Sequence, residues 1–88
     1  MLVEFRGFDH RSEQQTKEVK MPYELWTAIL RDLKLPDGEH TPTYQWSTAE
    51  CSKFIALLEP LRPGHEALEG ILKVMQEVVE KRWFMRVW

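Results

Sequence analysis

The sequence has little cysteine: Cys51 is the only one among 88 residues, so no disulfide can form within the chain. Small secreted domains usually depend on several disulfides, because their hydrophobic cores are thin. The N-terminal segment carries charges at Glu4 and Arg6 where a signal peptide would have an apolar core. We therefore expect a protein of the reducing cytoplasm.

Long hydrophobic runs are also missing. No stretch approaches the roughly 20 apolar residues needed to span a bilayer, so we expect no membrane partner.

Basic residues are not clustered densely enough to form a nucleic-acid binding surface. Residues 1–34 carry six basic and six acidic groups, residues 35–80 have a net charge of −5, and residues 81–88 add +3. Because phosphate backbones attract dense Lys and Arg patches, we expect no nucleic-acid partner.

Motifs that carry catalysis or bind cofactors are absent as well. The four glycines are isolated, which excludes a glycine-rich phosphate loop, and no nucleophile elbow is present. The three histidines, His10, His40 and His65, have no cysteine at zinc-ligand spacing. We predict that the protein is not an enzyme and uses no cofactor.

What is present is typical of a folded globular domain, with 43% hydrophobic and 30% charged residues. A chain of this length supports one domain, residues 1–88, with a thin core. Residues 2–8 alternate between apolar and polar, and residues 83–88 are aromatic and β-branched, so both segments are predicted strands. A further strand at 16–21 stays an open alternative, because Gln, Lys and Glu are poor strand formers.

Three helices are predicted between the terminal strands. Pro22 suits a first helical position, and apolar residues recur at helical spacing from Leu25 to Leu33. The second helix has a capping box, in which Ser47 and Glu50 each accept from the other's backbone amide. The third is predicted over residues 65–82 from its 3.6-residue apolar period. Residues 35–46 form the longest irregular stretch.

The order of these elements predicts an α+β fold. We expect a small antiparallel sheet of two or three strands, with the N- and C-terminal strands paired and three helices covering one face.

Two reactive groups have ordinary structural explanations. Cys51 lies in the first turns of the second helix, which favours the thiolate, but its register places it on the apolar stripe, where burial makes a thiol inert. His65 and Glu69 share the spacing of the zinc-protease motif H-E-x-x-H, with glutamate in place of the second histidine. A small metal-binding protein or enzyme using His65 and Glu69, with His40, is therefore an alternative function.

The terminal strands are apolar on both faces. If one face packs against the helices, the other holds the candidate interface residues Leu2, Phe8, Phe84, Arg86 and Trp88. Large apolar groups rimmed by charge mark interaction sites, unless a loop covers them. We predict a non-enzymatic protein-interaction module whose partner is another protein or a second copy in a homodimer. An alternative is an immunity- or antitoxin-like inhibitor whose acidic middle blocks a basic partner.

Overall fold

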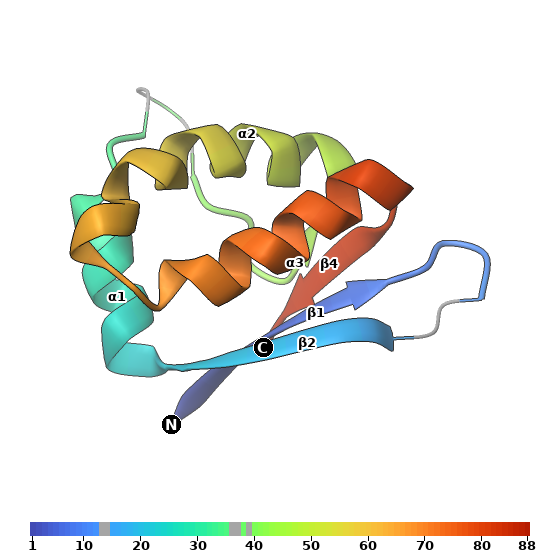
Figure 1. Cartoon of the computed structure of the whole chain (residues 1–88), viewed down its shortest axis with the longest axis horizontal. Helices are drawn as coiled ribbons and strands as arrows, with labels where there is room; N and C mark the ends of the chain where they lie inside the picture. The colour runs from blue at the N-terminus through green and yellow to red at the C-terminus, as the bar shows by residue number, and fades with distance from the viewer. Residues whose placement is uncertain (13–14, 36–37, 39) are drawn as a thin grey trace.

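The computed structural model describes residues 1–12, 15–35, 38 and 40–88. It has an α+β fold, with four antiparallel strands and three α-helices (Figure 1). In chain order the elements are β1 (Leu2–Phe8), β2 (Gln15–Pro22), α1 (Tyr23–Asp32), β3 (Gln45–Trp46), α2 (Thr48–Leu58), the 3₁₀ helix η1 (Glu59–Gly64), α3 (Leu68–Lys81) and β4 (Phe84–Val87). No helix in the described residues is both long enough and apolar enough to cross a bilayer.

The sheet has the strand order β2-β1-β4-β3. The predicted pairing of the terminal strands is confirmed, since Phe5 lies opposite Val87 and the pairing extends to reciprocal backbone hydrogen bonds between Glu4 and Trp88, at 3.0 and 3.1 Å. The open alternative at 16–21 is resolved in favour of a strand, because β2 pairs along the whole of β1.

The predicted count of two or three strands is wrong, because β3 adds a fourth inside the segment expected to be irregular. Two residues are too few for an alternating pattern to be read from sequence. Long-range hydrogen bonds hold this segment beside β4: the Val87 amide donates to the Tyr44 carbonyl at 2.8 Å, and the Thr48 hydroxyl donates to the Trp83 carbonyl at 2.6 Å.

The core lies between the helices and one set of strand side chains. Strand residues Val3, Phe5, Met21 and Met85 are buried in one cluster with residues of all three α-helices, and Figure 1 shows α2 and α3 lying over the strands. α3 approaches β2 closely at Gly70, where an added Cβ would lie 2.9 Å from Val19 Cγ2. Glycine at this point lets the helix pack directly on the strand.

Two predicted helix boundaries shift, and one is confirmed. The capping box is present, with Ser47 Oγ accepting from the Glu50 amide at 3.1 Å and Glu50 Oε1 accepting from the Ser47 amide at 2.9 Å. Pro22 is the N-cap of α1 rather than its first helical residue, because it also ends β2. α3 begins at Leu68 rather than at position 65, since His65 has non-helical backbone angles after η1.

Candidate functional site

The five predicted interface residues lie on the sheet face opposite the core. Phe8 and Phe84 stack on each other with ring centroids 5.5 Å apart, and they are only 8% and 5% exposed although neither belongs to the core cluster. The two aromatic rings thus cover one another. Leu2 and Trp88 are open to solvent, at 55% and 46% exposure.

Arg86 is packed among aromatic rings on this face. Its guanidinium carbon lies 5.0 Å from the centroid of Phe8, 5.1 Å from Phe84 and 5.8 Å from Tyr44, distances typical of cation–π contacts. Its Nε is buried without a hydrogen-bond partner, and no carboxylate pairs with it among the described residues. The described residues thus place ring faces and no carboxylate around its charge, and, because Nε is buried, an acceptor from outside would meet the terminal guanidinium nitrogens.

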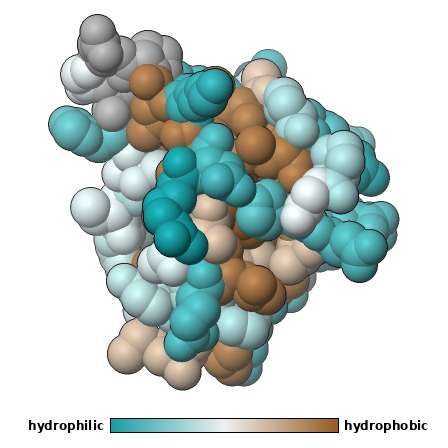
Figure 2. Space-filling view, turned by 90° about the vertical axis from the view of Figure 1, so that its left-hand side faces the viewer, coloured by the Kyte–Doolittle hydropathy of each residue, from teal (hydrophilic) through white to brown (hydrophobic). Residues whose placement is uncertain are grey.

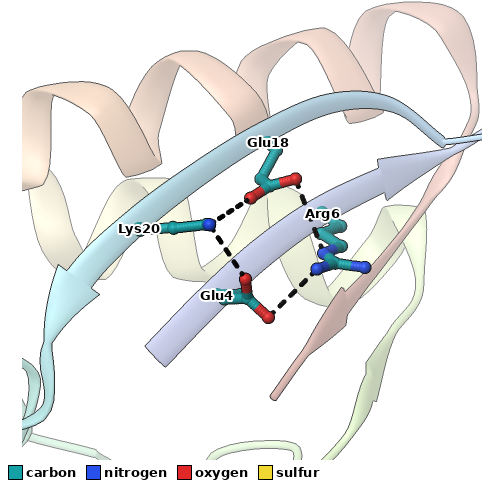
Figure 3. Close-up of polar contacts among 4 residues, drawn as sticks. All are labelled: Glu4, Arg6, Glu18 and Lys20. Atoms are coloured by element: carbon teal, nitrogen blue, oxygen red, sulfur yellow. Dashed lines mark hydrogen bonds and ion pairs between the residues drawn. The ribbon is translucent and has the colours of Figure 1, made fainter. Parts of the chain in front are cut away.

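Arg6 is nearby on the same face and, unlike Arg86, has carboxylate partners, although its Nε also lacks a hydrogen-bond partner. Its guanidinium carbon lies 4.6 Å from the Trp88 ring. Figure 3 shows a closed ring of alternating charges on β1 and β2. Arg6 lies 3.0 Å from Glu4 and 3.7 Å from Glu18, and Lys20 lies 3.4 Å and 3.3 Å from the same two carboxylates. The hydrogen bonds of Lys20 to Glu18 and then to Glu4 raise its pKa above the ordinary value. This ring has no net charge, so among the described residues of this face Arg86 is the cation without a carboxylate partner.

Exposed apolar side chains gather at the end of the sheet where β1 begins and β4 ends. Six large hydrophobic residues are exposed in the described part of the chain: Met1, Leu2, Tyr23, Leu25, Tyr44 and Trp88. Four of them line one largely apolar pocket of about 250 Å³, whose lining is Met1, Leu2, Val3, Tyr23, Trp26, Thr43, Val87 and Trp88. Tyr44 meets the edge of Trp88 at 5.6 Å, which links this pocket to Arg86. We call this cavity of about 250 Å³ the apolar pocket.

A second largely apolar pocket, of about 280 Å³, is lined by Asp32, Lys34, Ala56, Leu57, Pro60 and Leu61, none of which is among the six exposed large hydrophobic residues. Figure 2 shows the side of the molecule that carries α1 and the N-terminus, where brown hydrophobic patches lie among teal hydrophilic side chains. Leu25, the remaining exposed leucine of α1, does not line the apolar pocket.

Local ion pairs engage much of the acidic middle of the chain. Glu50 is held in the capping box, Glu59 pairs with Arg62 at 3.4 Å, and Glu77 pairs with Lys17 at 3.2 Å. These carboxylates have partners within the fold, so the free negative charge available to a basic partner is smaller than the sequence count indicates.

The alternative metal site is not assembled by these side chains. His65 Nε2 lies 2.8 Å from Asp32 Oδ2 and so joins the residue after η1 to the end of α1, whereas Glu69 lies 3.9 Å from Lys73. The described residues contain no group of three side chains placed to hold a metal ion. His40 is exposed and belongs to no such group.

Cys51 is completely buried in the core. Burial, with a smaller contribution from the Glu50 carboxylate, raises the pKa of its thiol to about 12. A thiol that stays protonated at neutral pH is a poor nucleophile, which agrees with a packing role.

Comparison with known proteins adds no relative. No protein-family model, no curated protein and no solved structure matches this chain.

Proposed function

We propose that this chain is a non-enzymatic protein-interaction module acting in the cytoplasm. Its ligand is a partner segment that carries one large apolar side chain close to a carboxylate. The observation that carries the proposal is the concentration of four of the six exposed large hydrophobic residues around the apolar pocket. Exposed apolar groups scattered singly are ordinary, but a contiguous group around a cavity is typical of a binding surface.

The apolar pocket supplies the anchor of this interface. Trp88 and Tyr23 are each nearly half exposed at its rim, while Trp26 and Val87 form more buried walls. Binding energy at interfaces is concentrated where a large side chain fills a pocket rimmed by Trp, Tyr and Arg. A volume of about 250 Å³ accommodates one aromatic or branched side chain.

Arg86 supplies the polar specificity. Its guanidinium is connected to the apolar pocket through Tyr44 and Trp88, and it has no carboxylate among the described residues. Guanidinium–carboxylate pairs are strong when they are bidentate and shielded, as the ring faces of Phe8 and Phe84 would make this one. A second copy of the chain offers Glu4 and Glu18 on the same face, but both are held in the charge ring. We therefore favour a different protein over a homodimer.

The test is selection from a random dodecapeptide display library on immobilised protein. Wild type should enrich peptides with a large apolar residue within a few positions of Asp or Glu. Trp88→Ser should lose this enrichment, and Arg86→Gln should keep the apolar residue but lose the acidic one. Leu25→Ser is the matched control, because it removes an exposed leucine outside the apolar pocket.

Two outcomes would contradict the proposal. If wild type enriches no motif, or if Trp88→Ser enriches the same motif with circular dichroism unchanged, the pocket is not the binding site. Sedimentation equilibrium of both proteins tests self-association in parallel. A wild-type dimer that Trp88→Ser converts to a monomer would assign the face to a second copy instead.

A further inference from the structure

A basic pocket lies at the opposite end of the sheet, where β1 ends and β4 begins. It has a volume of about 360 Å³ and is lined by two segments, Asp9, His10 and Arg11 after β1 and Lys81, Arg82 and Trp83 between α3 and β4. Three cationic side chains and a histidine thus share it with one carboxylate. This local excess of positive charge contrasts with the net charge of −2 of the whole chain.

The helix dipole does not explain this cluster. Basic residues in a last helical turn are favourable near its free carbonyls, which accounts for Lys81. The carbonyls of Val78 and Val79 already accept from the amides of Arg82 and Trp83. Arg11 comes from the segment after β1, and among the described residues neither its guanidinium nor that of Arg82 has an ion pair.

Arg82 occupies an unfavourable backbone conformation. Its φ of 57° and ψ of 43° lie in the left-handed region, and it is the only residue other than glycine with positive φ in the described part of the chain. Glycine is the usual residue at this position after a helix, because it has no Cβ to strain. An arginine here destabilises the fold relative to glycine, and strained residues of this kind cluster at functional sites.

The geometry points to a binding site for the phosphate group of a phosphorylated ligand. Arg11 and Arg82 approach from separate segments, and guanidinium groups match phosphate oxygens in bidentate pairs. Lys81 adds a third cation, which lies 5.2 Å from the Trp83 ring and 3.9 Å from Glu77. The two arginines are therefore the cations of the pocket without an ion pair among the described residues. Asp9 is the one acidic side chain in the lining, and its Oδ1 accepts from the Arg11 amide at 2.7 Å, which holds the turn. Its single negative charge is outnumbered by the three cations of the pocket.

The site is tested by NMR titration of the whole protein with pyrophosphate, inorganic phosphate and a phosphoserine pentapeptide, against chloride at equal ionic strength. We expect saturable shifts at the Arg11 and Arg82 amides and the Trp83 indole. Saturation by the inorganic probes identifies a small phosphorylated ligand, and saturation by the phosphopeptide alone identifies a phosphorylated protein. Shifts that do not saturate with any of the three probes would overturn the site.

Arg82→Gly separates binding from folding. Relief of the left-handed strain should raise the melting temperature by roughly 4 °C, while loss of the guanidinium should weaken phosphate binding by about tenfold or more. Arg31→Gln removes an exposed arginine of α1 outside the pocket and should leave the affinity unchanged. Equal weakening by both variants would reduce the effect to overall charge and contradict a defined site.

Discussion

The contact between Gly70 and Val19 allows a quantitative test of how α3 packs on β2. Gly→Ala in a helix ordinarily stabilises a protein by up to about 1 kcal/mol, and Gly70 lies in the first turn of α3. Here the new Cβ would lie 2.9 Å from Val19 Cγ2, whereas carbon atoms pack at about 3.5–4.0 Å. Val19 is β-branched, so its χ1 is stiff, and overpacking of this kind costs about 1–3 kcal/mol. We expect Gly70→Ala to destabilise the fold by about 1 kcal/mol net.

The assay is urea unfolding of Gly70→Ala, Val19→Ala and the double variant. In the Val19→Ala background Cγ2 is gone, so Gly70→Ala should stabilise by its full helical value of about 1 kcal/mol. The coupling between the two sites is then about 2 kcal/mol, well above the value for independent positions. If Gly70→Ala stabilises both backgrounds equally, α3 does not approach β2 at this point and the reasoning is refuted.

Two further predictions concern α2. Ser47→Ala removes the hydroxyl that caps the Glu50 amide and should lower the free energy of unfolding by about 1 kcal/mol; an unchanged urea midpoint would mean that the cap contributes nothing. The thiol of Cys51 keeps its proton in the folded state up to a pKa of about 12, against an ordinary value of 9.0. The free energy of unfolding therefore falls as the pH rises above the pKa of the thiol in the unfolded chain. Between about pH 8 and about pH 10 the wild type should lose about 1.4 kcal/mol more of this free energy than Cys51→Ala. Identical pH profiles would contradict a buried thiol, and Lys20 cancels in this comparison because both proteins contain it.

Local signals in the sequence were sufficient for several elements. The capping box of Ser47 and Glu50 depends on residues three positions apart, so it can be read directly from the chain. The apolar period of α3 and the alternation of β1 are likewise local. Pairing of the terminal strands could be predicted because the sequence indicates so few strands that these two are the natural partners in one sheet. The structure confirms this pairing.

Features that depend on contacts distant in sequence could not be predicted. β3 is only two residues long and is held by hydrogen bonds to β4, which no local pattern encodes. Sequence reasoning named Leu2 and Trp88 but missed Met1 and Tyr23, because the apolar pocket forms only when β1, α1 and β4 meet. The mutual burial of Phe8 and Phe84 and the unpaired state of Arg86 likewise emerge only from the assembled face.

We propose that Arg86 recognises a carboxylate beside the apolar pocket. The most direct test is the affinity, by isothermal titration calorimetry, of the best selected dodecapeptide and of its Asp→Asn or Glu→Gln form for wild type and for Arg86→Gln. We predict that removing the peptide carboxylate weakens binding to wild type by about tenfold and to Arg86→Gln by much less, since a charge-assisted hydrogen bond contributes roughly 1.5–3 kcal/mol. An equal loss of affinity for both proteins would show that Arg86 does not contact the carboxylate, which would contradict the proposed recognition.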